Sequence, residues 1–332
     1  MGVSCSCNEQ LSTALEDQQI VEELTKAVSS SSVAEAVESI QAPPTETSEN
    51  QVVESQAVAL SKAEVPAEVE AFYAETKSLL EANAVPEVPS STGWQDISKP
   101  SAKVFLKSKA APARDCVYFH IQSQDQVPKL PMLEVAEGKI TCGAIPTVWA
   151  TKHWPLWFPF CDSVEMLRFY SPTSMLVQVK LKVLFVTLDF VLFLGIKDLI
   201  DTKGFVEVVF RSPPEGSEGK EWMGITVPPL AGSLPRICIA FAGFKAYPKT
   251  ETNVEVEYQA EMLDTAGAPQ WIKIFIFQQL SIRIIPELVK FQQKIPGSPL
   301  HRYLNSELTQ ESRDFLFGLH KKFQDHLARR TA

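Results

Sequence analysis

The sequence predicts an α+β fold in which a curved antiparallel sheet wraps around one long C-terminal helix. Apolar segments of strand length follow one another between residues 165 and 263. A segment with helical spacing precedes them at residues 64–84, and a longer one follows at residues 269–295. Strands gathered in one run, with helices before and after them, are typical of the α+β class.

Residues 1–62 are predicted to be a largely disordered, acidic tether. The first 100 residues hold 17 acidic side chains against four lysines, a net charge of −13, so a total of −9 leaves +4 for residues 101–332. Residues 9–62 contain no Gly, Trp, Phe or Tyr and cannot bury enough apolar area to offset the entropy of ordering them. A tail without a function is the alternative.

The chain opens with the pattern of an acylation signal. Gly2 becomes a myristate acceptor once Met1 is removed, and Ser6 stands where the signal requires a hydroxyl. One myristoyl chain binds a bilayer with a constant of only roughly 10⁴ M⁻¹, so a stable anchor needs a second signal. We expect palmitate on Cys5 and Cys7 to supply it. An ordinary frayed terminus is the alternative.

Composition argues against several other classes of protein. Lys and Arg are scattered rather than clustered, so nucleic acid is not an expected partner. The six cysteines form no C-x-x-C pair, and no secretory signal is evident, which favours a reducing compartment. The most apolar stretch, residues 183–196, is shorter than the roughly 20 residues of a membrane span and is predicted to be a buried strand.

The elements of the globular part are predicted from periodicity. A helix at residues 64–84 is followed by an antiparallel pair at 104–106 and 116–121, and then by helical segments from 130 to 150. The later strands are predicted at 165–170, 175–184, 186–194, 204–210, 236–244 and 253–263. The helix at 269–295 contains Pro286, which should kink it.

A final helix is predicted after Thr309, which can cap it. Its apolar residues form one stripe, and its basic residues lie mostly away from that stripe. Such a helix rests on a membrane surface or packs back on its own domain. The pattern leaves both interpretations open.

A sheet that curls around a helix encloses a space between the two. Apolar walls with a few polar groups would make this space a pocket of lipid size. The same apolar faces could equally close into a solid core, and the sequence pattern alone does not decide between the two.

Several segments, in this order along the chain, resemble the START family of lipid-binding domains. Gly93-Trp94 is similar to the opening of the family's first strand region, and residues 153–160 to its tryptophan-containing turn. Residues 175–210 resemble its central strands. The best match is residues 253–271, in which an alternating strand leads into a D-x-x-G-x-x-P-like turn, with the proline one residue early, and then a tryptophan.

The resemblance covers roughly residues 64–295, about two-thirds of the chain. It implies a helix-grip fold, a hydrophobic tunnel for one lipid and a lid helix that moves to admit it. It does not imply which lipid is bound, because fold does not fix function.

The chain departs from the family at one charged pair. Many relatives carry an Arg-Asp pair in a central strand, where this chain has Leu188-Asp189. A cationic partner for Asp189 must therefore come from elsewhere or be absent. A charge among apolar neighbours needs a partner, so Asp189 and Arg283 either pair with each other or address a polar headgroup. An Arg283 on the helix surface is the alternative.

The candidate lipid-binding residues come from the central strands and the C-terminal helix. They are Phe185, Asp189, Phe190, Phe193, Ile239, Phe241, Phe244, Trp271, Phe275, Gln279 and Arg283. Both faces of residues 183–194 are apolar, so strand alternation does not tell which side faces a cavity, and each apolar candidate is alternatively plain core. The proline-rich loop at 224–235 is expected to gate the tunnel mouth, to dip into lipid or to be an ordinary surface loop.

The sequence shows no motif of enzyme chemistry. It lacks G-x-S-x-G, H-E-x-x-H and the phosphate-binding G-x-x-x-x-G-K-[S/T]. His153 and Cys161 share a tryptophan-rich turn, but no third group is apparent to orient the histidine. We therefore expect no catalytic residues, no metal and no cofactor.

The leading hypothesis is a lipid carrier or sensor at the cytoplasmic face of a membrane. Its organisation would be an acylated tether at 1–62, a START-like domain at 64–295 and a C-terminal extension at 296–332 with a basic amphipathic helix. Its partners would be one lipid ligand and the membrane surface. The alternatives are a scaffold or regulatory protein with a closed pocket, and an enzyme of the same fold acting on a lipid ester.

Overall fold

The computed structural model describes residues 67–82, 95–96, 102–111, 114–123, 127–128, 130–183, 186–230, 236–263 and 270–331. The predicted tether, with Gly2, Cys5 and Cys7, lies outside these residues, as does Phe185. The predicted division of the chain at residues 62 and 296 stays a prediction.

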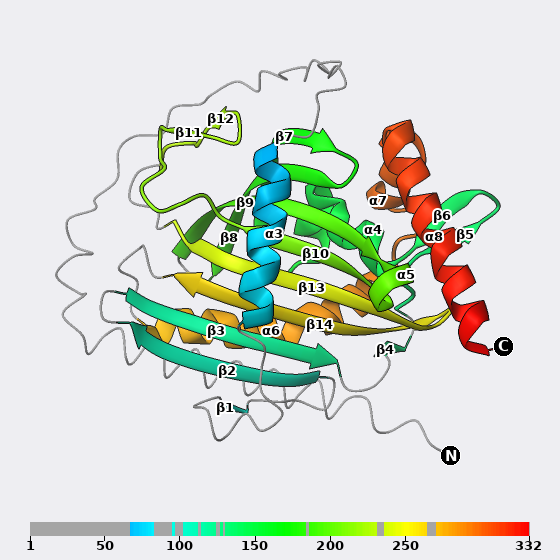
Figure 1. Cartoon of the computed structure of the whole chain (residues 1–332), viewed down its shortest axis with the longest axis horizontal. Helices are drawn as coiled ribbons and strands as arrows, with labels where there is room; N and C mark the ends of the chain where they lie inside the picture. Colours follow the sequence, from blue (N-terminus) through cyan, green and yellow to red (C-terminus); the bar gives the residue numbers. More distant parts are fainter. Residues whose placement is uncertain are drawn as a thin grey trace. The chain divides into compact units, whose positions relative to one another are not determined.

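One large antiparallel sheet forms the centre of the structure (Figure 1). Its spatial order is β1-β2-β3-β14-β13-β10-β9-β8-β7, and β4 pairs with β14. The strands are β1 (Gln95–Asp96), β2 (Ala102–Ala111), β3 (Arg114–Ser123), β4 (Val127–Pro128), β7 (Cys161–Ser171), β8 (Ser174–Val183), β9 (Val186–Leu199), β10 (Phe205–Arg211), β13 (Cys238–Thr250) and β14 (Asn253–Leu263). Two small hairpins lie outside it: β5 (Glu134–Ala136) with β6 (Lys139–Cys142), and β11 (Glu221–Trp222) with β12 (Ile225–Thr226).

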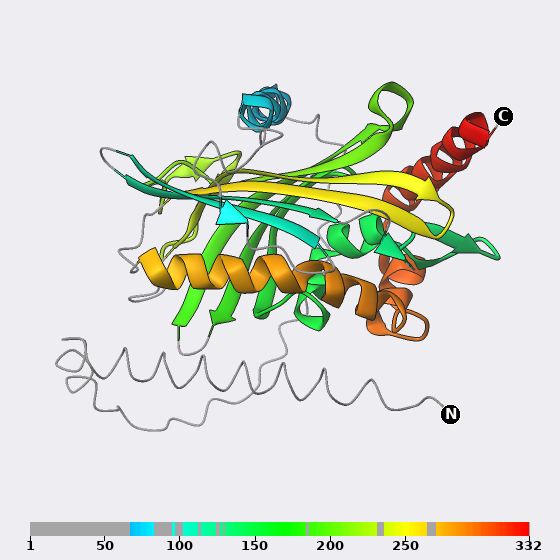
Figure 2. The same ribbon diagram turned by 90° about the horizontal axis from the view of Figure 1, so that it is seen from below.

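Helices cover both faces of the sheet (Figures 1 and 2). The helices are α3 (Ala67–Ala82), α4 (Ala144–Trp149), the 3₁₀ segment η2 (Thr151–Leu156), α5 (Ile200–Lys203), α6 (Gln270–Gln292), α7 (Pro299–Arg302), the π-helical turn η3 (Tyr303–Glu307) and α8 (Gln310–Thr331). Helix α3 crosses one face, called here the outer face, and α6 lies against the opposite, inner face. The predicted α+β helix-grip fold is confirmed.

The outer face is closed by α3. Val69 and Tyr73 of this helix are buried against side chains of β9, β10 and β13. The hydroxyl of Tyr73 donates a 2.7 Å hydrogen bond to the carbonyl of Thr173. Directly beneath the ring lies Gly195, where a β-carbon would stand 2.1 Å from the Tyr73 hydroxyl oxygen. The helix can therefore approach the sheet this closely only because residue 195 has no side chain.

The C-terminal end of α6 is fixed to the inner layer by the amide of Gln292, which is 4% exposed. Its oxygen accepts a 2.7 Å hydrogen bond from the backbone N–H of Gly143, and its nitrogen donates at 3.1 Å to the hydroxyl of Thr147. The long helix is thereby held against α4 at this end. Pro286 lies inside α6, which continues beyond it to Gln292.

The last helix packs back on the domain. Leu316, Leu319 and Phe323 of α8 are each at most 3% exposed, and α8 contacts α5 and β13. Thr309 caps the helix by accepting a hydrogen bond from the N–H of Ser312. Lys322 pairs with Asp198 at 2.5 Å. The apolar stripe is therefore used for packing rather than left open to a membrane surface.

The prediction of helix throughout residues 130–150 was wrong in its first part. Only α4 is helical there, and β5 and β6 form a hairpin before it. Its two-residue turn is Glu137-Gly138, and both have positive φ, 51° and 72°. Turns of this kind match the twist of the flanking strands and favour glycine at the second position. The single Gly138 was the available signal.

No helix in the part of the chain that the structure describes combines the length and the hydrophobicity needed to cross a membrane.

We expect Gly195→Ala to destabilise the fold by about 1–3 kcal/mol, because the added methyl group must displace the Tyr73 ring that closes the outer face. Urea unfolding of purified protein measures this. Gly318→Ala in α8 is the control, since nothing lies within 4 Å of its β-carbon position. That variant should instead gain about 0.5–1 kcal/mol from helix propensity. Equal stabilities of the two variants would contradict the proposed packing.

Candidate functional site

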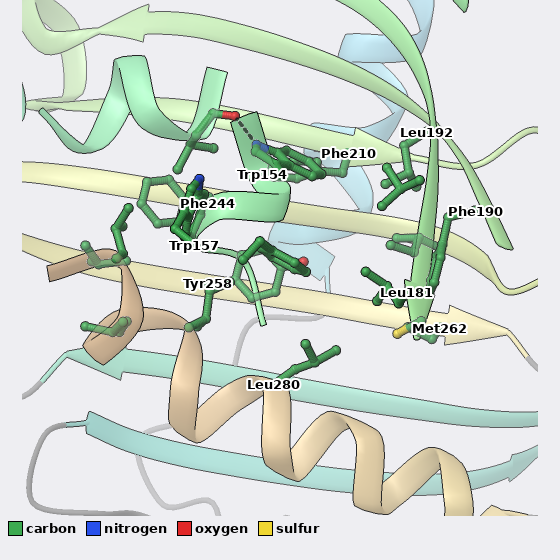
Figure 3. Close-up of a pocket in the computed structure, with 18 residues that line it drawn as sticks. Trp154, Trp157, Leu181, Phe190, Leu192, Phe210, Phe244, Tyr258, Met262 and Leu280 are labelled. Carbon is green, nitrogen blue, oxygen red and sulfur yellow. Dashed lines mark hydrogen bonds between the residues drawn. The ribbon is translucent and has the colours of Figure 1, made fainter. Parts of the chain in front are cut away.

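An apolar cavity lies between the inner face of the sheet and α6 (Figure 3). Its volume, measured as the space open to the centre of a water molecule, is about 90 Å³. The lining comes from α4 and the turn after it, five strands and α6: Val148, Trp154, Trp157, Phe158, Val179, Leu181, Phe190, Leu192, Phe210, Ile239, Phe244, Val256, Tyr258, Met262, Leu280, Ile284, Ile285 and Leu288.

Alternation along β9 decides which of its side chains reach the cavity. Phe190 and Leu192 face inward and line it, whereas Val191 and Phe193 belong to the cluster under α3. Successive side chains of a strand point to opposite faces, so one apolar strand serves both layers. The expectation that Phe193 lines the pocket was wrong: its ring packs 5.3 Å from that of Phe72 in α3.

A β-bulge makes the same distinction in β13. Ile239 lines the cavity, and simple alternation would place Phe241 beside it. The pairing with β14 shifts register between these two residues, so both Ala240 and Phe241 pack in the outer cluster. After the bulge Phe244 returns to the inner face and lines the cavity. The pocket role expected for Phe241 was therefore wrong, because a bulge adds one residue and inverts the facing.

An aromatic turn after α4 forms one wall. Trp154 stacks on Phe158 with ring centroids 5.4 Å apart, and Trp157 meets Phe158 edge-on at 5.6 Å. The indole N–H of Trp154 donates a 2.9 Å hydrogen bond to the carbonyl of Val148 (dashed in Figure 3). From the sequence, this turn was considered for its likeness to a family segment and for His153 and Cys161, but not as a cavity wall. Its density of aromatic residues was the signal for a cavity wall.

The second tryptophan of this wall has an unusual environment. Trp157 is 6% exposed and lines the cavity. Its indole nitrogen is buried, and it has no hydrogen-bond partner among the residues that the structure describes. An N–H group hidden from water without an acceptor carries an uncompensated desolvation cost.

The chemistry of the cavity is almost entirely that of hydrocarbon. Of its 18 lining residues, all of them described, none carries a charge at neutral pH. Burial raises the pKa of Tyr258 far above its usual value, so its hydroxyl stays neutral. The cavity can surround an apolar molecule but offers no counter-charge to an ion.

The remaining candidates from the C-terminal helix do not line the cavity or cannot be placed. Gln279 and Arg283 are half-buried and are absent from the lining. The guanidinium of Arg283 lies 5.7 Å from the ring centre of Phe160. The backbone of α6 is described at positions 271 and 275, but the side chains of Trp271 and Phe275 lie outside the described residues.

Comparison with known proteins gives a fold but no sequence relative. No protein-family model and no curated protein sequence matches the chain. The crystal structure of human STARD10 superposes with a TM-score of 0.50 at 12% identity, covering 68% of this chain and 80% of that one. The fold is START-like.

Two further structures resemble the START-like domain less closely. Human StAR-related lipid transfer protein 5 gives a TM-score of 0.49 at 14% identity, covering 69% of this chain and 96% of its own. The Zhui aromatase/cyclase of a Streptomyces species gives 0.34 at 10% identity, covering 57% and 98%. At sequence identities this low, the function of these proteins cannot be carried over to this chain.

In this START-like domain Asp189 lies on the outer face, away from the cavity. Its carboxylate accepts hydrogen bonds from Nε and Nη2 of Arg236 at 2.8 and 2.5 Å, and from the amide nitrogen of Gln178 at 2.6 Å. Asp189 and Arg236 are 2% and 4% exposed. Asp189 therefore pairs with neither Arg283 nor a headgroup in the cavity. A partner 47 residues away along the chain gives no sequence signal.

The Asp189–Arg236 pair fastens a loop to the outer face of the START-like domain. Arg236 also donates a 2.8 Å hydrogen bond to the carbonyl of Pro228. Met223 and Val227 are buried in the cluster under α3, and the hydroxyl of Tyr170 donates at 2.7 Å to the carbonyl of Met223. The described part of the loop expected at residues 224–235 thus lies opposite the cavity. Residues 231–235 lie outside the description.

We expect Asp189→Leu to cost about 3–5 kcal/mol of unfolding free energy, because the buried guanidinium of Arg236 loses its buried carboxylate and keeps only the partly exposed Glu218, 3.6 Å away. The double variant Asp189→Leu/Arg236→Met should recover most of that loss, since no unpaired buried charge remains. Urea titration of the three proteins checks both values. A single variant within about 0.5 kcal/mol of wild type would show that the pair is not buried in solution.

Proposed function

We propose that the START-like domain binds one lipid molecule in its inner cavity and serves as a non-enzymatic carrier or sensor. The observation that carries this proposal is the cavity itself: an apolar space between the sheet and α6 with 18 described lining residues, none of them charged. Ligand pockets are lined mainly by hydrophobic and aromatic side chains, as this one is. Lipid transfer appears in the names of several proteins of similar fold, but the proposal does not rest on them.

The binding energy would come from burial of hydrocarbon. Each methylene moved from water into such a cavity contributes about 0.8 kcal/mol. The walls come from strands whose positions are fixed by the sheet, so little ordering is needed when a ligand enters. An uncharged lining contributed jointly by five strands, the aromatic turn and α6 favours the lipid-binding function over the scaffold alternative.

The side chains in the aromatic turn do not favour the enzyme alternative. Burial raises the pKa of the Cys161 thiol to about 12, so the nucleophilic thiolate is scarce at neutral pH. Burial also lowers the pKa of His153, and its Nε2 has no hydrogen-bond partner within the described residues. A nucleophile and base that act together need a hydrogen bond between them and a third group to orient the base.

Filling the cavity should abolish lipid binding while the protein stays folded. We expect full-length protein from a eukaryotic host to carry a lipid in about equimolar amount by native mass spectrometry and organic extraction. Leu192→Trp should lose it, because Leu192 points into the cavity and the larger ring occupies the ligand's space.

Met166→Trp is the matched control, since Met166 is an exposed residue of β7 at 44% and adds the same bulk outside the cavity. It should retain the lipid. Circular dichroism establishes that both variants are folded. A wild-type protein that stays free of lipid after mixing with liposomes of varied composition would remove the proposed function in favour of the closed-pocket scaffold.

We further propose that the protein is held at the cytoplasmic face of a membrane by acylation of its N-terminus. The support is the sequence signal alone: Gly2 and Ser6 in the myristoylation pattern, with Cys5 and Cys7 as palmitate acceptors. The acidic residues that follow would keep the tether extended and away from anionic lipid.

Intact mass of the protein isolated from its native cell tests the anchor. The expected result is a mass increase of one myristoyl group after loss of Met1, with further increments for palmitate that hydroxylamine removes. Gly2→Ala should abolish the first increment and release the protein from the membrane fraction. An unmodified Gly2 with free thiols at Cys5 and Cys7 would end the proposal.

A further inference from the structure

Two features of the cavity indicate what kind of lipid it takes: its uncharged lining and the unpartnered indole N–H of Trp157. The inference rests on the proposed lipid-binding function. Two tryptophans line the cavity, and both pack against Phe158. The N–H of Trp154 is bonded to the carbonyl of Val148 at 2.9 Å. That of Trp157 is buried and has no acceptor within the described part of the chain.

We propose that the ligand is an uncharged lipid with one oxygen acceptor, such as an ester, ketone or hydroxyl group, and that this oxygen accepts a hydrogen bond from Nε1–H of Trp157. Buried donors in folded proteins are nearly always satisfied by protein, water or ligand. Only 6% of Trp157 is exposed, so bulk water does not accept a hydrogen bond from its N–H. An acceptor brought in by the ligand completes the wall.

The absence of charge follows from the same residues. A carboxylate or phosphate moved from water into an apolar space is strongly disfavoured unless an opposite charge meets it. None of the 18 described lining residues supplies one. The buried cation Arg236 cannot supply it either, because it lies on the outer face and is paired with Asp189. A lipid with an ionised group inside the cavity would therefore be excluded, whereas a neutral oxygen needs only the one donor.

Three probes of similar length separate the effect of the hydrogen bond from the effect of charge. Tetradecane has no acceptor, methyl dodecanoate has a neutral ester, and dodecanoate is charged. Dissociation constants are measured by equilibrium dialysis of radiolabelled probe against delipidated full-length protein. The comparison is made between wild type, Trp157→Phe and Trp154→Phe. Ratios between variant and wild type cancel the different solubilities of the probes.

We expect Trp157→Phe to weaken the binding of methyl dodecanoate by roughly three- to tenfold, the size of one net hydrogen bond. The dissociation constant of tetradecane should change by less than about twofold. Trp154→Phe removes the same atoms from the same wall, but its N–H already has a protein acceptor. It should therefore change the binding of both probes by one common factor. Dodecanoate should bind wild type at least about tenfold more weakly than the ester does.

Each failure has a distinct meaning. If Trp157→Phe changes ester and alkane equally, the hydrogen bond is refuted while lipid binding stands. If dodecanoate binds as tightly as the ester, the uncharged class is refuted. If none of the probes binds and no lipid is extracted from the wild-type protein, the proposed function itself fails. Should Trp157→Phe not fold, benzothienylalanine at position 157 replaces the N–H by sulfur in the same shape and gives the same comparison.

Discussion

The structure depends on one constraint: the central strands are apolar on both sides, so both faces of the sheet must be covered. In β9 the side chains of Phe190 and Leu192 point one way and those of Val191 and Phe193 the other. Strands of this kind are stable only between two layers. Helix α3 supplies the outer layer and fits closely, because Gly195 has no side chain. Helix α6 supplies the inner layer, and the cavity lies between it and the sheet, with the aromatic turn as one wall.

Sequence periodicity located the main strands and helices of the fold. Strand β14 was predicted with its observed bounds, Asn253–Leu263, and α6 and α8 were expected within a few residues of where they lie. Local pattern is informative for such elements because the spacing of apolar residues within a strand or helix identifies its buried face without any other part of the chain. The hairpin of β5 and β6 was missed because each strand is at most four residues long and is marked only by the turn at Gly138.

The site was less predictable, because the relevant facts are set by tertiary structure. Phe190, Ile239 and Phe244 do line the cavity, but a parity argument could not separate them from Phe193 and Phe241. A strand buried on both sides shows no alternation, and a bulge reverses the facing without altering the sequence pattern. The partner of Asp189 likewise depends on how the chain returns to the sheet 47 residues later.

The apolar cavity also has a consequence for how much of the protein persists in a cell. Side chains facing an empty space forfeit dispersion contacts, so the unliganded fold is the weaker one. A ligand that binds only the folded state adds RT ln(1 + [L]/Kd) to its stability, about 2.7 kcal/mol at one hundred times Kd. Differences of about 1–2 kcal/mol change the cellular abundance of a protein several-fold, because unfolded chains are degraded. Under the proposed lipid-binding function, the amount of this protein would thus rise with the supply of its ligand.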